Sequence, residues 1–283
     1  MDLKTTVLVD GLVLPEGPRW HADKLWFSDV FGCQVKTVDL QGQTTLVAEA
    51  PAMPAGLGWL PDGRLLVVSM LDRRLLRLDP DGLVEVADLS KLMAAIANDM
   101  VVDQVGRAYI GDVGFDMFAG QDYAQAEIVL VMPDGEARVV ADKLDFPNGM
   151  IITPDERTLI VGETAGARLT TFDIRPDGSL TGRRTWAQIA GSSPDGICLD
   201  AEGAIWVASP GSAEVVRVRE GGEITHRVRL RLPRKPFACM LGGPDRRTLF
   251  IMTAETVNIE EARALKSGRI EVVQVEVPGA GWP

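Results

Sequence analysis

The stretch SPDGICLDAEGAIWVAS, Ser193–Ser209, holds a polar anchor, a short apolar run, a turn containing Gly and a second apolar run. The same order occurs six times in the 283 residues, at a spacing of about 40 to 50 residues. The other five units start at Leu14, Pro54, Ala97, Phe146 and Pro236. This period is typical of a propeller blade, so the repeat predicts an all-β, six-bladed β-propeller of four-stranded antiparallel blades.

The segments between the units are expected to complete the blades. A third run with alternating apolar and polar residues follows most units, as in EIVLVMPDG at 127–135, and Gly, Pro and Asp punctuate these runs. Residues 5–10, TTVLVD, precede the first unit and are predicted to add an outer strand to the last blade. Such a strand closes the ring and removes an exposed edge. Because a closed ring cannot be divided, residues 1–283 are predicted to be a single domain.

One position of the repeat is unusually polar. The residue before the Gly-like position of each unit is, in chain order, Glu16, Ala55, Asn98, Asn148, Asp195 and Phe237. The first strand of every blade lines the central channel, so these side chains are expected at one height around the axis. Carboxylates and amides buried together need compensation, which a cation supplies. Their oxygen donors favour one divalent cation, Ca²⁺ first, with Zn²⁺, Mn²⁺ or Mg²⁺ as alternatives.

Two of these residues have a simpler interpretation. Pro194-Asp195-Gly196 has the composition of an ordinary turn, as Pro61-Asp62-Gly63 does. The register favours a site for Asp195, because the turn of its unit comes seven residues after Gly196. For Asn98, turn and site remain open.

Composition excludes several other classes. A net charge of −11 argues against a nucleic-acid partner. The sequence has no run of ~18 apolar residues, so no membrane span is expected. The absence of a secretory signal predicts a cytoplasmic protein. Three cysteines without CxxC spacing are predicted to be buried rather than disulfide-bonded or zinc-bound. With only two histidines and no GxSxG, GxxxxGK or GxGxxG, a catalytic triad or phosphate loop is not expected. A small-molecule substrate at one end of the channel is the predicted partner, and the oligomeric state stays open.

Three motifs carry a family resemblance. They are LPEGP with Glu16, FPNGM with Asn148 and SPDGICLDAEGAIWVAS with Asp195, in this order and in the matching blades. With them the chain resembles the SMP-30/gluconolactonase/luciferin-regenerating-enzyme family over essentially its whole length. The resemblance implies six blades, one divalent cation bound by Glu16, Asn148 and Asp195, and lactone hydrolysis at the channel mouth.

The family's RxND segment corresponds here to residues 96–99, IAND. The resemblance implies that Asn98 either contacts substrate or ligates the metal, with Asp99 beside it. Ile96 stands where the family has an Arg that holds substrate hydroxyls. Losing a guanidinium removes up to five donors, so we expect the substrate at Ile96 to be less polar than an aldonolactone.

Residues 114–127, GFDMFAGQDYAQAE, lie where the family places a lid over the site. Four apolar or aromatic side chains of this segment suit an apolar cover: Phe115, Met117, Phe118 and Tyr123. Asp116 is a candidate substrate contact. The alternative is a loop that packs only on its own blade.

These expectations combine into metal-assisted lactone hydrolysis. A cation polarises the lactone carbonyl and lowers the pKa of a water molecule. Asp195 is the predicted general base, with Asp99 as the alternative. Three other functions remain open: organophosphate hydrolysis, non-hydrolytic chemistry as in the strictosidine-synthase-like propellers, and a non-enzymatic calcium-binding or interaction scaffold.

Overall fold

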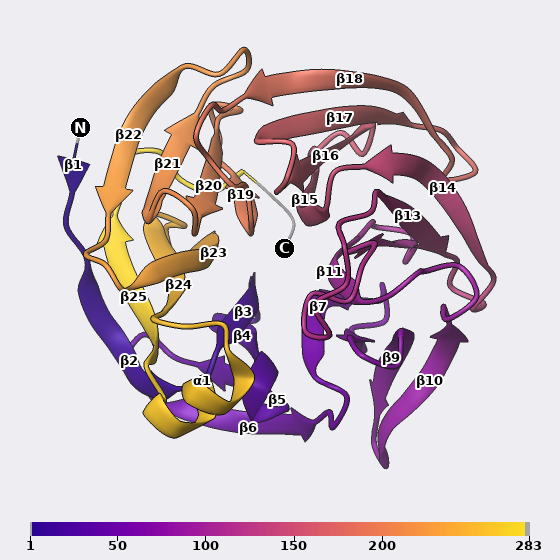
Figure 1. Cartoon of the computed structure of the whole chain (residues 1–283), viewed down its shortest axis with the longest axis horizontal. Helices are drawn as coiled ribbons and strands as arrows, with labels where there is room; N and C mark the ends of the chain where they lie inside the picture. The colour runs from indigo at the N-terminus through magenta and orange to yellow at the C-terminus, as the bar shows by residue number, and fades with distance from the viewer. Residues whose placement is uncertain (1, 281–283) are drawn as a thin grey trace.

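The computed structural model describes residues 2–280 and confirms a six-bladed β-propeller (Figure 1). Each blade has four antiparallel strands, which follow one another from the axis outward. Blade 1 consists of β3 (Pro15–His21), β4 (Lys24–Asp29), β5 (Gln34–Val38) and β6 (Thr44–Glu49). Blade 2 consists of β7 (Pro54–Trp59), β8 (Leu65–Ser69), β9 (Arg74–Asp79) and β10 (Gly82–Asp88). Blade 3 consists of β11 (Ala97–Val102), β12 (Ala108–Asp112), β13 (Ala126–Val131) and β14 (Ala137–Leu144). Blade 4 consists of β15 (Pro147–Ile152), β16 (Thr158–Glu163), β17 (Arg168–Ile174) and β18 (Leu180–Gln188). Blade 5 consists of β19 (Ile197–Leu199), β20 (Ile205–Ser209), β21 (Glu214–Val218) and β22 (Ile224–Arg229). Blade 6 consists of β23 (Lys235–Gly242), β24 (Thr248–Ala254), β25 (Gly268–Gln274) and β2 (Thr6–Leu12).

The N-terminal segment closes the ring, as the sequence predicts. Strand β2 pairs antiparallel with β25 and forms the outer edge of blade 6. A feature that the sequence did not indicate is β1 (Asp2–Leu3), which pairs in parallel with β22 of blade 5. The N-terminus therefore joins two neighbouring blades. The described residues also form two short helices outside the blades, the 3-10 helix η1 (Val30–Gly32) and α1 (Ile259–Leu265).

The six inner strands contact one another in cyclic order, β3, β7, β11, β15, β19, β23 and back to β3. Glycine makes this close approach possible. A Cβ added to Gly149 would lie 2.6 Å from the backbone oxygen of Asp195, in the next blade. A Cβ on Gly56 would lie 2.4 Å from the backbone nitrogen of Met100. Since real Cβ atoms do not approach backbone so closely, the repeated glycine is a packing requirement of the ring.

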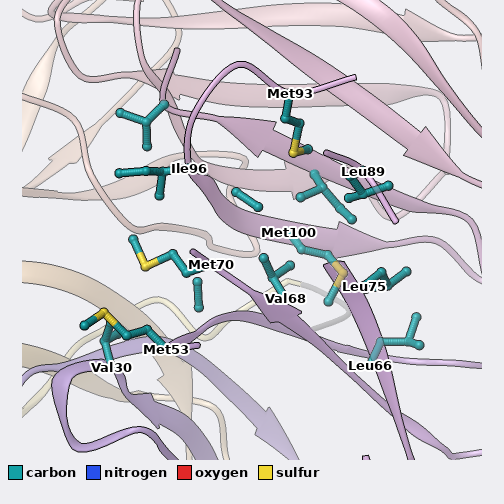
Figure 2. Packing of buried hydrophobic residues seen from close by; sticks show 14 of the residues in the cluster. Val30, Met53, Leu66, Val68, Met70, Leu75, Leu89, Met93, Ile96 and Met100 are labelled. Carbon is teal, nitrogen blue, oxygen red and sulfur yellow. The ribbon is translucent and has the colours of Figure 1, made fainter. Parts of the chain in front are cut away.

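Buried apolar side chains fill the space between blades. The largest cluster lies mainly in blades 2 and 3, reaches η1 and α1, and includes Leu66, Val68, Leu75, Leu89 and Met100 (Figure 2). Cys198 and Cys239 are also buried, which confirms their prediction as core residues, whereas Cys33 is half-buried; all three are free. Among residues 2–280, no helix has the length and apolar character needed to cross a membrane.

Buried polar side chains at the ends of the second strands hold the segments that connect the blades. Asp29 Oδ1 accepts hydrogen bonds from the backbone nitrogens of Val13 and Leu14, at 3.0 and 2.9 Å. Glu163 Oε2 accepts one from the backbone nitrogen of Asp145 at 2.7 Å. These bonds satisfy buried backbone donors and fix each inner strand where it enters the ring.

Gly149→Ala is expected to lower the free energy of unfolding by roughly 2–3 kcal/mol, because the added methyl group overlaps backbone that cannot move away. Denaturant unfolding measures the loss. Gly63→Ala is the control, since Gly63 has φ +86° but nothing within 4 Å of the added Cβ. We expect only the roughly 1 kcal/mol cost of left-handed backbone there. Equal losses in the two variants would contradict the packing requirement.

Candidate metal and substrate site

A backbone irregularity occurs at the same place in five of the six inner strands. The strand register shifts between Glu16 and Arg19 in β3, between Ala97 and Met100 in β11, and between Pro147 and Met150 in β15. Strands β7 and β23 shift at the equivalent place. A β-bulge re-aims the side chains beside it. The polar register predicted from the sequence coincides with these bulges.

All six register residues line one cavity of ≈ 250 Å³. Its polar lining consists of Glu16, Asn98, Asp99, Asn148, Thr164, Ser193 and Asp195. Asp195 lies shortly before β19 and is not part of a hairpin turn. Its backbone nitrogen donates to Ala208 O at 2.9 Å, and the turn of this unit lies at residues 200–203. The structure therefore brings together oxygen donors from blades 1, 3, 4 and 5.

The amide of Asn148 is oriented by the chain around it. Its Nδ2 donates to Thr164 Oγ1 at 3.2 Å, and Thr164 Oγ1 donates to the backbone oxygen of Pro194 at 2.6 Å. Asn148 also hydrogen-bonds to the Asp195 carboxyl. Because Nδ2 makes these bonds, the carbonyl oxygen Oδ1 is the atom left to bind a ligand. Thr164 carries no signal in the sequence, since it follows the polar end of β16 in what reads as a connecting segment.

Two carboxyl groups of the cavity favour their protonated form. Loss of water contacts raises the pKa of Glu16 to about 8, and the nearby Asp99 adds to the shift. Burial also raises the pKa of Asp195 well above its ordinary value, and the charges of Glu16 and Asp99 raise it further. A hydrogen bond from Gly17 N to Glu16 Oε2, at 3.0 Å, and the charge of Arg19 oppose the shift of Glu16, and a hydrogen bond from Asn148 opposes that of Asp195. The pair therefore requires either protons or a cation.

Asp99 has a different environment from the other two carboxylates. Its Oδ1 accepts hydrogen bonds from Arg19 Nη2 at 2.9 Å and from the backbone nitrogen of Met100 at 2.8 Å. Arg19 is 4% exposed and comes from blade 1, two blades away in the ring. The ion pair crosses the base of the cavity between these blades and neutralises one of its three carboxylates.

Apolar side chains form the walls and the cover of the cavity. Met117 and Phe118, from the segment predicted as a lid, line it, and Phe118 packs edge-on against Phe31 of η1 with ring centroids 5.9 Å apart. Phe31 and Val257, from segments far apart in the chain, complete the cover. Other apolar lining residues are Leu14, Val30, Met70, Val113, Phe146 and Phe237.

Two predicted substrate contacts lie elsewhere. Ile96 is 1% exposed and packs in the cluster between blades 2 and 3, outside the cavity lining (Figure 2). Asp116 is also outside the lining. Its Oδ1 accepts hydrogen bonds from the backbone nitrogens of Phe118 and Ala119, both at 2.9 Å, so it orders the loop that presents Phe118. Phe115 and Tyr123 pack on each other with centroids 5.7 Å apart and do not line the cavity either.

Comparison with known proteins identifies the family. The model of the SMP-30/gluconolactonase/LRE-like region matches residues 14–255. The chain belongs to this family. It is 29% identical to 6-deoxy-6-sulfogluconolactonase of Pseudomonas putida, over 66% of this chain and 64% of that relative. The match thus spans less than two-thirds of the relative's length.

Solved structures of the SMP-30/gluconolactonase/LRE-like type share the fold. A gluconolactonase from Xanthomonas campestris superposes with a TM-score of 0.74 at 26% identity, over 96% of this chain and 88% of that one. A regucalcin from Agrobacterium tumefaciens, described as calcium-binding, gives a TM-score of 0.80 at 23% identity, over 100% and 97% of the two chains. At this identity the second match shows the fold alone.

The residues of this family member fit a divalent cation. Within 2–280, no three His, Cys, Asp or Glu side chains gather closely enough to form a metal cluster by themselves. The donor set is instead mixed, with the carboxylates of Glu16 and Asp195 and the amide oxygen of Asn148. Neither carboxylate has an ion-pair partner among the described residues, and no described Lys or Arg lines the cavity. Oxygen-only donors of this kind suit hard cations.

The raised pKa of Glu16 predicts how stability depends on pH in the metal-free protein. Its folded pKa, about 8, lies above the ordinary 4.5, so its contribution is fully present below pH 4.5 and is lost as pH rises to 8. We expect chelator-treated protein to lose a few kcal/mol of unfolding free energy over this window. Glu16→Gln should flatten the profile. Identical profiles for the two proteins, measured by urea unfolding, would contradict this assignment.

Proposed function

We propose that the chain is a lactone hydrolase that uses one divalent cation, Ca²⁺ first among the candidates. The observation that carries this proposal is the cavity itself. Two carboxylates without an ion-pair partner among the described residues and one oriented amide lie in a cavity of ≈ 250 Å³ whose walls are predominantly apolar. The family's name and the gluconolactonases among its relatives support ester hydrolysis.

The proposed roles follow from the contacts of each side chain. Glu16, Asn148 and Asp195 would hold the cation, which when bound polarises the lactone carbonyl and stabilises developing negative charge. Asp195 also accepts the proton of the attacking water, because its carboxylate lines the cavity and has no ion-pair partner among the described residues. Asp99 suits this role less, since its Oδ1 is engaged by Arg19 and Met100.

Three further polar residues can position the substrate. Asn98, Ser193 and Thr164 line the same cavity, so an amide and two hydroxyls face a lactone bound there. Whether the amide of Asn98 bonds the substrate or joins the cation's ligands, it adds a neutral oxygen donor beside the carboxylates.

The proposed substrate is a neutral lactone with an apolar substituent. The walls are predominantly apolar, and no described Lys or Arg lines them. Apart from the proposed cation, which would bind the lactone carbonyl, a sulfonate or phosphate would find no cationic partner in such a cavity, which is costly. The sulfonated lactone named for the Pseudomonas relative is therefore a poor fit. Ile96 itself contributes nothing to this choice, because it lies outside the cavity lining.

Asp195→Asn is expected to lower kcat/KM for a lactone by at least about 100-fold, because the variant loses the general base and one anionic ligand. Asp62→Asn is the matched control, since Asp62 also lies between Pro and Gly, but in a different segment that forms an exposed turn. It should keep activity within about twofold. Chelation should abolish hydrolysis by the wild-type protein, and added Ca²⁺ should restore it.

Full activity of Asp195→Asn would exclude the proposed base. A protein that binds Ca²⁺ but hydrolyses no lactone in a panel would support the calcium-binding scaffold instead. Turnover of phosphotriesters alone would support organophosphate hydrolysis.

Phe118→Ala should distinguish a substrate-binding cover from a loop packed only on its blade. We expect kcat/KM to fall roughly tenfold or more for a long-chain alkyl lactone and less than about threefold for an unsubstituted one. The control is Phe115→Ala, from the same segment but outside the lining. It should affect both substrates equally. Equal effects of Phe118→Ala on both lactones would contradict the apolar substrate.

A further inference from the structure

Arg19 is a buried arginine at the base of the candidate site, and the proposed hydrolysis assigns it no role. It lies in β3, three residues after Glu16 and beyond the bulge that separates them. Its Nη1 donates to Pro18 O at 2.9 Å, and its Nη2 donates to Asp99 Oδ1 at 2.9 Å and to Met100 O. Because the residue is almost fully buried, the guanidinium is fixed by the inner strands of two blades.

Stability alone does not explain this pair. Moving an Arg and an Asp out of water costs free energy that their attraction only partly returns, and neutral replacements of similar volume are often no less stable. On its other side Arg19 adjoins a second, small cavity lined mainly by apolar side chains, among them Val101, Met150 and Ile197. The pair differs from the buried Arg217–Asp200 pair of blade 5 in that its carboxylate lines the candidate site, and this position points to an electrostatic role.

The charges of the cavity give that role. Glu16, Asp99 and Asp195 line it and carry three negative charges when ionised. Arg19 is not itself a lining residue but pairs with one of them, and no described Lys or Arg lines the cavity. Two negative charges remain, and a divalent cation balances them. Without Arg19 the cavity would carry three, which a trivalent cation balances better.

We infer that Arg19 is a positioning residue that sets the charge of the cation site and so its preference for divalent over trivalent ions. It acts through Asp99, which it holds at the base of the cavity and removes from the set of free carboxylates. This inference rests on the proposed cation site, but not on lactone hydrolysis.

The test is a charge cycle on the full-length protein stripped of metal. Calorimetric titration with Ca²⁺ and with La³⁺ gives the ratio of their association constants for wild type, Arg19→Met, Asp99→Asn and the double variant. In Arg19→Met the ratio of La³⁺ to Ca²⁺ affinity should rise at least about tenfold, since a trivalent ion gains more from an added negative charge. In the double variant, which restores two net charges, the ratio should return to within about threefold of wild type.

Arg217→Met controls for the loss of a buried arginine. Arg217 is 2% exposed and pairs with Asp200 at 2.6 Å in blade 5, outside the cavity. It should lose stability without changing the ratio. If Arg19→Met does not fold, Asp99→Asn still decides: keeping Arg19 with one carboxylate fewer should lower Ca²⁺ affinity at least about tenfold.

An unchanged ratio in Arg19→Met, a shift that persists in the double variant, or unchanged Ca²⁺ affinity in Asp99→Asn would each overturn the inference. Absence of any cation binding by the wild-type protein would overturn both this inference and the proposed cofactor. Cation binding with the expected shift but no lactone turnover would support Arg19's role and defeat only the hydrolase proposal.

Discussion

The close approach of six inner strands around one axis is the constraint on which the rest of this structure depends. Gly56, Gly149 and Gly196 allow it, because an added Cβ at each would fall 2.4 to 2.6 Å from atoms of the next blade. Where the repeat lacks glycine, other residues accommodate the contact: the third blade has Asp99 and the sixth has Ala238. At the position of these glycines the inner strand of the third blade carries a charged side chain, Asp99. The base of the cavity forms there.

The candidate site arises from a second backbone feature of the inner strands. A bulge at one repeat position turns consecutive side chains of an inner strand toward the axis, which a regular strand would send to opposite faces. Segments more than forty residues apart in the chain therefore each contribute a donor at one height. In two of the six blades this position is apolar within the same fold, at Ala55 and Phe237. The polar residues at Glu16, Asn148 and Asp195 are thus not required by the architecture.

The sequence predicted the parts of this structure that repeat. The period of the repeat predicted six blades, and residues 5–10 were predicted as the closing strand. The residue before the Gly-like position of each unit identified six of the residues that line the cavity. It did not predict where a side chain points when a bulge or a connecting segment intervenes. Ile96 directs its side chain into the blade 2–3 cluster, and Asp116 orders its own loop. Phe31, Thr164 and Val257 line the cavity from connecting segments, whose placement depends on contacts distant in sequence. Arg19 looked like an ordinary strand residue because its partner lies 80 positions away.

Arg19, protons and a cation can each neutralise part of the buried negative charge, and each does so under different conditions. Arg19 is permanent, since a guanidinium keeps its proton at any physiological pH and is anchored by two backbone oxygens as well as by Asp99. Protons compensate Glu16 and Asp195 only below the raised pKa values of these groups. A cation must displace those protons, so its affinity rises with pH until both carboxyls are ionised. Arg19 neutralises one of the three carboxylates and leaves two open to exchange, so binding of a cation would also remove the proton from Asp195, the proposed base. The same event would therefore prepare both the proposed base and the proposed cation site.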